Sequence, residues 1–551
     1  MYIIRITNGK EKIMKKDIGM RVRDKFLPYL IFPSIVGVLT GVLIFIFKVT
    51  ASFVMHKSFE LYSYAQENPK YIPLIILAAC LIGCVSAFLL KWAKDCRGGG
   101  IPTAVATIRD LIPLRWIQCI FGLFASSMLT FLGGVPLGNE GPSVQMGTAV
   151  GKGTTKMLGK RYRAWERYNM TGGASAGFAV ATGSPLSGIV FAMEEIHRRF
   201  SPPILIVAAI SVITATATAQ TLSGWCGIDS AFINFEISEV LPLRFLWIAV
   251  LIGIVCGICA NLLTKLYHLI RNKAKASKFK IPFVVNVMLI FTVVGALGVA
   301  CVDFVGSGHS LIEHILERRT VWYIVLIAFV IRAILMIVAN VSGVSGGLFV
   351  PTLALGAMVS SLLADALIAL GIIGEEYYAI LVVVGIASFL SAASRIPLTA
   401  LTFAAEALCV VNNILPVVAG VIIAYLTVEI IGNTSFADTV IEAKSHDAHA
   451  GKTPTVVDCR MMAEKGSFAV GMEVRDILWP PTCTVLSVDK SNSSSRRHSG
   501  MIEAGDVLHL HYLTYDSADT LELLAGILGD QDEDDSAHIR AVDDNHIVPG
   551  H

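Results

Sequence analysis

The chain has 551 residues, of which 54% are hydrophobic and only 16% are charged, and its mean hydropathy is +0.67. Soluble domains carry roughly 25% charged residues. This composition therefore excludes an ordinary water-soluble particle of this size and predicts a chain wetted largely by lipid. The formal net charge of +2 is uninformative as a total, and we expect no nucleic acid among the partners.

Apolar segments of about twenty residues, the length that crosses a hydrocarbon core of roughly 30 Å, recur along the chain. They cover residues 27–47, 72–90, 245–263, 281–302 and 321–341, and shorter or glycine-interrupted runs occur at 116–134, 204–222, 378–393 and 414–431. Lipid leaves every backbone polar group to be satisfied internally, which favours helices. We therefore predict an all-α polytopic membrane protein with more than ten helical segments.

The placement of basic residues predicts an orientation. Residues 1–26 contain eight Lys and Arg residues, and Lys91, Lys94 and Arg97 follow after two spans. A basic flank before the first span favours a cytoplasmic N-terminus. We expect residues 1–26 to be a cytoplasmic segment of a multi-pass protein in the cell membrane, with the C-terminal domain also in the cytoplasm.

The composition changes near residue 445, where the apolar segments end. We expect a transmembrane domain over 27–440, a small soluble α/β domain over 455–530, and an acidic, disordered tail over 531–551. The eleven cysteines are scattered without the spacing of zinc ligands. We therefore predict neither a metal nor a cofactor.

The membrane part repeats itself. Pro142-Ser143 recurs as Pro351-Thr352, and the run from Pro185 to Glu194 recurs as the run from Pro397 to Glu406, at nearly one offset. Two patterns in register indicate an internal duplication, with halves at about 27–225 and 240–440. Many transporters consist of two such halves in inverted orientation around a midplane site, but the sequence indicates only the repeat.

Three clusters of glycine and proline interrupt the apolar pattern, at Gly98–Pro102, Gly138–Pro142 and Gly347–Pro351. Proline suits the first turn of a helix because its missing N–H would have no partner there. Helix N-termini attract anions through free N–H groups and the positive dipole end. The clusters therefore predict broken helices around an anion site; the alternative is surface turns.

Glu140 lies within the second cluster, in an apolar region where a carboxylate is costly and indicates function. Burial favours the protonated form of a carboxylate, so Glu140 could exchange protons at ordinary pH. When ionised it would compete with the anion for the same N–H groups, which would couple the two movements. The alternative role is a helix N-cap.

Glu194 and Glu195 end the run that starts at Pro185, and His197-Arg198-Arg199 follows at once. These basic residues mark a cytoplasmic boundary. One of the two glutamates could take up protons from that side; the alternative is a solvated helix end. Glu406, the repeat partner of Glu194, is predicted to be structural.

The three clusters, in this order, resemble the signature motifs of the CLC family of chloride channels and antiporters, usually written GSGIP, GKEGP or GREGP, and GxFxP. The resemblance covers about residues 27–440. It implies an inverted-repeat fold with broken helices and a homodimer with one pore in each subunit. It assigns Glu140 the role of external gating glutamate and Glu195 that of internal proton-transfer glutamate.

The resemblance also implies which residues hold the anion: Gly99, Gly100, Ile101, Gly141, Leu348, Phe349 and Phe436. Three positions depart from the family pattern. Gly99 replaces a frequent coordinating Ser, Asn139 replaces Lys or Arg, and Phe436 aligns with a coordinating Tyr, with a slip of one residue open. Loss of both hydroxyls would weaken the inner part of the site.

The stretch from Phe468 to Leu508 resembles the C-terminal ligand-binding domain of TrkA-type potassium-uptake regulators. Strand alternation and the Ala504-Gly505-Asp506 turn agree with a small α/β domain. The resemblance implies a regulatory role, with an unidentified small ligand or a dimer contact.

These observations predict a secondary-active antiporter that exchanges chloride for protons. Three alternatives stay open: a passive chloride channel, a fluoride/proton antiporter of the same family, and a membrane-anchored sensor. A membrane enzyme would need a nucleophile, a metal cluster or a paired acid and base at membrane depth. The apolar segments offer no such set, so we do not expect an enzyme.

Overall fold

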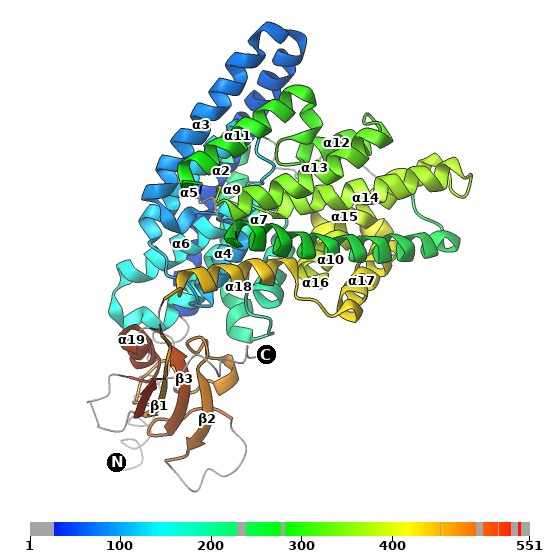
Figure 1. Ribbon diagram of the computed structural model, residues 1–551. Helices are drawn as coiled ribbons and strands as arrows, with labels where there is room; N and C mark the ends of the chain where they lie inside the picture. Colours follow the sequence, from blue (N-terminus) through cyan, green and yellow to red (C-terminus); the bar gives the residue numbers. More distant parts are fainter. Residues whose placement is uncertain are drawn as a thin grey trace, which may run out of the picture.

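The computed structural model describes residues 27–228, 239–276, 281–451, 453–491, 500–515, 517–529 and 538–541. The expected basic segment 1–26 lies outside the described residues. Figure 1 shows a large helical body with a small α/β domain attached at one end.

Among the described residues, the first half of the helical body contains eight α-helices. They are α2 (Leu27–Glu67), α3 (Ile72–Trp92), α4 (Ile101–Ile108), α5 (Trp116–Leu132), α6 (Glu140–Leu158), α7 (Glu166–Thr182), α8 (Pro185–Phe191) and α9 (Pro202–Cys226). A π-helical turn, Ala192–Ile196, follows α8 directly.

The second half continues with α10 (Leu246–Ala276), α11 (Phe283–Ala300), α12 (His309–Leu316), α13 (Trp322–Val341), α14 (Phe349–Ala369), α15 (Tyr378–Ser394), α16 (Pro397–Ala407), α17 (Ile414–Ile431) and α18 (Phe436–Ala448). Within the described ranges, nine helices are long and apolar enough to cross a membrane. The expected multi-pass helical architecture is thus confirmed. The first span is longer than expected, because α2 runs on to Glu67.

Close helix packing in the body depends on small residues. At the crossing of α6 and α7, a Cβ on Gly147 would lie 2.0 Å from the carbonyl oxygen of Gly173, and a Cβ on Gly173 would lie 2.0 Å from that of Gly147. Only glycine fits at such a crossing. In lipid, association of helices depends on this kind of backbone approach rather than on a hydrophobic driving force.

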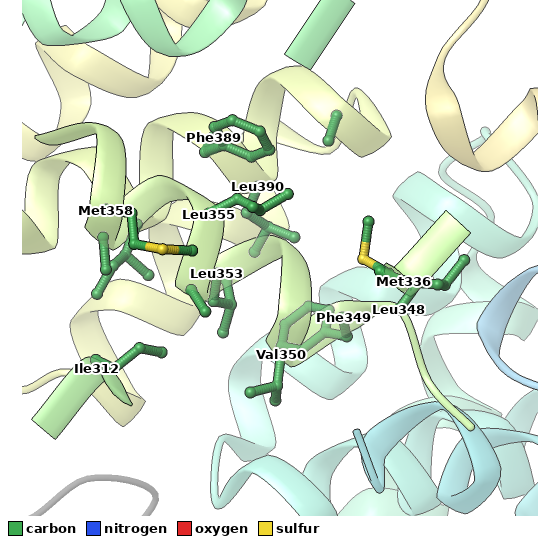
Figure 2. Packing of buried hydrophobic residues seen from close by; sticks show 14 of the residues in the cluster. Ile312, Met336, Leu348, Phe349, Val350, Leu353, Leu355, Met358, Phe389 and Leu390 are labelled. Carbon is green, nitrogen blue, oxygen red and sulfur yellow. The ribbon is translucent and has the colours of Figure 1, made fainter. Parts of the chain in front are cut away.

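The main core surrounds α14 and α15, which are buried along most of their length. Figure 2 shows Phe349, Leu353 and Met358 of α14 packed with Phe389 and Leu390 of α15. A helix that is apolar and buried all round lies in the centre of a bundle. The third glycine–proline cluster therefore opens onto the middle of the protein.

The C-terminal domain is a four-stranded antiparallel sheet in the order β2-β3-β1-β4. Its strands are β1 (Thr455–Met462), β2 (Thr484–Asp489), β3 (Val507–Thr514) and β4 (His538–Ala541). The helix α19 (Ser517–Leu528) packs Leu524 and Ile527 against the apolar face of the sheet. The expected α/β domain is thus present.

The expectation of a disordered tail over 531–551 needs one correction. The segment His538–Ala541 forms β4 and pairs with β1, whose edge would otherwise leave backbone groups unpaired. The remainder of the tail, residues 530–537 and 542–551, lies outside the described residues.

Candidate anion and proton site

Each of the three glycine–proline clusters begins a helix. The helices α4, α6 and α14 have Gly100, Asn139 and Leu348 at their N-cap positions. The N–H of Ser143 donates back to the carbonyl of Asn139 (3.1 Å) and that of Thr352 to Leu348 (3.1 Å), so helical bonding in α6 and α14 starts there. The earlier N–H groups of each helix face its open end.

The three helix ends meet. Gly138 and Gly347 exchange two backbone hydrogen bonds, of 2.8 and 2.7 Å, which tie the entrance of α6 to that of α14. A Cβ on Gly141 would lie 2.5 Å from the Cα of Gly347 and 2.9 Å from the Cα of Gly100. Three positive helix ends, two from the first repeat and one from more than 200 residues further along the chain, therefore face one small volume.

The α4 end differs from the expectation. The N–H of Gly99 donates to the carbonyl of Cys96 (3.0 Å), and the N–H of Gly100 donates to Oε1 of Gln145 (2.9 Å). Both amides have protein acceptors, which removes Gly99 and Gly100 from the anion-binding set and leaves Ile101 as the α4 candidate. The physical reason is that Gln145 of α6 reaches the space beside Gly99.

Sequence reasoning missed Gln145. The signal was available, because a polar side chain in a small-residue membrane helix needs partners. Its amide nitrogen donates to the carbonyl of Asp95 (3.0 Å), and its side chain is fully buried. Gln145 thus fixes the loop before α4 against α6.

Glu140 is fully buried at the first position of α6. Its Oε2 lies 2.6 Å from where a Cβ of Gly138 would stand, so the carboxylate folds over the junction of α6 and α14. In the orientation that satisfies its neighbours, the amide of Asn139 donates to Oε1 (2.6 Å) and Oε2 (3.2 Å). Nε2 of His309 lies 3.6 Å from Oε1. The Glu140 carboxylate therefore lies where it can compete with an anion for the N–H groups at the helix ends.

A cavity of about 470 Å³ adjoins this carboxylate. Its lining includes Asn139 and His309 beside Glu140, and also Lys48, Glu313 and His314. A polar cavity of this size holds many waters. Its Asn139 and His309 walls place it on the Glu140 side of the helix ends.

Glu195 lies in the π-helical turn after α8, with 2% of its surface exposed. Such turns are often found at functional sites. Arg109 fixes the turn by donating to the carbonyls of Glu195 and Ile196 (2.8 Å each). Within the described part of the chain, Oε2 of Glu195 is a buried oxygen with no hydrogen-bond partner. A buried, unsatisfied carboxylate oxygen is suited to holding a proton.

The neighbouring Glu194 has a different task. Its carboxylate accepts hydrogen bonds from the N–H groups of Leu398 (2.8 Å) and Thr399 (2.6 Å) at the start of α16, and from the Thr399 hydroxyl (2.7 Å). Glu194 is thus engaged as a helix cap. Of the two glutamates, Glu195 is thus the one with a buried carboxylate oxygen that has no hydrogen-bond partner among the described residues.

Aromatic rings line the region around Phe349. Its ring packs edge-on against Phe178 (5.2 Å between centroids) and Phe403 (5.3 Å), and Phe178 stacks on Phe191 (4.8 Å). Phe191 and Phe403 hold equivalent positions in the two repeats. Packed rings of this kind give a low-dielectric surrounding, in which electrostatic interactions are stronger than in water.

Phe436 is the first residue of α18 and is 3% exposed. Its ring packs edge-on against Tyr267 of α10 at 5.6 Å. The preceding Ser435 caps α18 by accepting a hydrogen bond from the N–H of Asp438 (3.0 Å). The structure thus places an apolar ring, without a hydroxyl, at the N-terminus of α18.

A family model described as voltage gated chloride channel matches residues 82–429. The chain belongs to this family, the CLC proteins. It is 25% identical over 453 residues to the H(+)/Cl(-) exchange transporter ClcA of Salmonella gallinarum, with 78% of this chain and 94% of the relative covered. It is also 25% identical over 441 residues to ClcA of Klebsiella pneumoniae, with 78% and 92% covered.

Solved structures show the same CLC fold. A slow cyanobacterial Cl⁻/H⁺ antiporter superposes with a TM-score of 0.68 at 23% identity, over 76% of this chain and 98% of that one. A CLC-type fluoride/proton antiporter superposes with a TM-score of 0.60 at 20% identity, over 75% and 98%. The expected CLC fold of this chain is confirmed.

Proposed function

We propose that this CLC protein exchanges chloride for protons across the cell membrane. The observation that carries the proposal is the meeting of the α6 and α14 N-termini at Gly138 and Gly347, with the buried Glu140 carboxylate folded over the junction. Helix ends bind an anion without a fixed positive charge, so the ion can also leave.

In the proposed cycle, the N–H groups of Gly141, Leu348 and Phe349 hold a dehydrated chloride, and Ile101 contributes from α4. Ionised Glu140 occupies the same N–H groups and excludes the anion. Proton uptake neutralises Glu140 and releases it toward the cavity, so chloride enters. Coupling follows because the helix ends accept one negative charge at a time.

Glu195 provides the second proton site of the proposed cycle. Its burial and its unpartnered Oε2 support this role. The relatives named as H(+)/Cl(-) exchange transporters support exchange over passive conduction. We therefore place the protein with the exchangers of its family, and we place Glu195 on the cytoplasmic side, beside Arg198 and Arg199.

The deciding experiment uses purified protein in sealed liposomes with a chloride gradient and an internal pH indicator. Valinomycin and potassium set the membrane potential. We expect the chloride gradient to drive protons against their own gradient. Chloride flux without proton movement would identify a channel. Fluoride, nitrate and chloride compared in the same assay decide the preferred anion.

We further propose that the C-terminal domain regulates transport from the cytoplasm. Arg167 donates to the carbonyls of Leu478 and Trp479, the hydroxyl of Tyr168 donates to the carbonyl of Asp476 (2.8 Å), and Arg199 donates to that of Ile477 (3.0 Å). The domain therefore contacts the start of α7 and the basic segment that follows Glu195. A small ligand bound to the domain could alter proton access there.

This regulation can be tested with a chain that ends near residue 448. We expect it to retain anion flux with a changed rate, because the anion site lies outside the removed part.

We also propose, from family membership, a homodimer with one pore in each subunit. Cross-linking of the protein in liposomes tests this assembly.

A further inference from the structure

His309 is the link between the cavity and the gating carboxylate. Glu140 is fully buried, whereas His309 lines the cavity with 24% of its side chain exposed. Nε2 of His309 lies 3.6 Å from Oε1 of Glu140, and Nδ1 lies 3.2 Å from the hydroxyl of Ser307. Asn139 also touches both the cavity and Glu140, but an amide does not titrate, whereas an imidazole nitrogen can take up and release a proton.

The fold fixes the position of His309. Arg332, buried in α13, donates to the carbonyls of Val305 and Gly306 (2.7 Å each) and of Asp303 (3.1 Å). These bonds hold the loop that leads into α12, of which His309 is the first residue. Gly308 takes a φ of 115° next to Arg332, which lets the chain turn into the helix there.

Other charged groups face the same space. Lys48 of α2 acts electrostatically on both His309 and Glu140. From α12 itself, Glu313 and His314 line the cavity, and His314 pairs with Asp303 at 3.0 Å. His56 of α2 also lines the cavity and pairs with Glu60 at 3.1 Å. Of these groups, His309 carries the titratable ring that lies 3.6 Å from the Glu140 carboxylate.

We propose that His309 delivers protons from the cavity to Glu140, an inference that rests on the proposed chloride/proton exchange. Imidazolium gives its Nε2 proton to Oε1 of Glu140 after a small rotation of either side chain. The products are a neutral imidazole that keeps its Nδ1 proton and a neutral carboxyl group. A protonated cavity water then returns a proton to Nε2 and becomes neutral water, so one proton passes for each cycle.

The test is His309→Asn in the full-length protein in liposomes, with His56→Asn as the matched control. Positioned acid–base groups contribute roughly 10²–10⁴-fold to proton transfer, so we expect coupled turnover to fall at least about 10-fold in His309→Asn. Added imidazole should restore part of the rate. His56→Asn should turn over as the parent does. Parent-like proton flux in His309→Asn would overturn the inference.

A second comparison separates proton delivery from a structural effect. Glu140→Gln should pass chloride without protons, and adding His309→Asn to that variant should leave the chloride flux unchanged. A fall in this flux as large as that in the coupled protein would also overturn the inference. A parent protein that moves no protons under a chloride gradient would instead reject the proposed exchange itself.

Discussion

Glu194 and Glu406 perform the same task in opposite halves of the protein. Glu194 caps α16 through the N–H groups of Leu398 and Thr399, and Glu406 caps α8 through those of Leu186 and Ser187 (2.9 Å each). Glu194 lies just after α8, the helix that Glu406 caps. Glu406 lies near the end of α16, the helix that Glu194 caps. Such reciprocal contacts are the mark of an approximate two-fold axis between the repeats.

The reciprocal caps predict a stability effect without a transport effect. Glu406→Gln keeps one acceptor oxygen but loses the charge-assisted bonds to two N–H groups, which are worth about 1–2 kcal/mol. We expect a lower unfolding temperature in detergent and an unchanged chloride-to-proton ratio in liposomes. A changed ratio at unchanged stability would show that Glu406 carries protons.

Glu195→Gln should abolish proton coupling and preserve chloride flux. The amide cannot release a proton, whereas the helix ends around Gly138 and Gly347 are untouched. Proton uptake and chloride efflux recorded on the same liposomes check this. Glu194→Gln is the matched control: it should weaken the cap of α16 and leave coupling intact. Intact coupling in Glu195→Gln would remove this residue from the proton path.

Gly141→Ala should disrupt the proposed anion site through a steric clash, without changing any charge. The added Cβ would stand 2.5 Å from the Cα of Gly347, where neither backbone can give way cheaply. Overpacking of this kind costs about 1–3 kcal/mol, and we expect chloride binding by calorimetry to be lost or severely weakened. Gly224→Ala, which meets nothing within 4 Å, should bind as the parent does. Parent-like binding in Gly141→Ala would show that the helix ends need not meet.

The C-terminal domain should lose stability in acid through Asp506. Burial alone would raise the pKa of this carboxyl, but hydrogen bonds from Lys490 (2.8 Å), the Glu503 N–H (2.8 Å) and the Ser491 N–H hold the pKa below its usual value. A lowered folded-state pKa gives stability that is present above the unfolded-state pKa of about 3.9. That stability is lost as pH falls through the lower, folded value.

Hydrogen exchange of β3 in the full-length protein measures this effect. We expect Asp506→Asn to speed exchange at pH 7 and to have a smaller effect at pH 3, which lies below the unfolded-state pKa of about 3.9, so that part of the stability from the parent carboxylate is already lost. Equal exchange in the two proteins at pH 7 would show that the carboxylate does not stabilise the turn. Exchange in α14 provides an internal reference, because that helix lies in the membrane domain.

The residues that depart from the family pattern can be identified in the sequence, but their structural consequences cannot. Gly99 suggested only a missing hydroxyl. The structure instead shows the Gly100 N–H donating to the side-chain oxygen Oε1 of Gln145, because α6 crosses the loop before α4 at close range. Sequence spacing gives no measure of such a crossing, since the two residues are 45 positions apart. Sequence analysis missed His309 for the same reason. A single histidine at a helix start attracts no notice until the fold places it beside Glu140, which lies 169 residues earlier.

The sequence by itself determined the membrane class, the helical segments, the repeat, the three helix starts and the two candidate glutamates. Hydrophobic length, proline and glycine chemistry, and the cost of a carboxylate in lipid are local properties, so they can be read along the chain. Tertiary structure decided that the helix ends meet, which amides remain for an anion, which glutamate is a cap, and that His309 stands between the cavity and Glu140. Those facts depend on how distant helices pack, and packing is set by three-dimensional fit between surfaces rather than by any one segment.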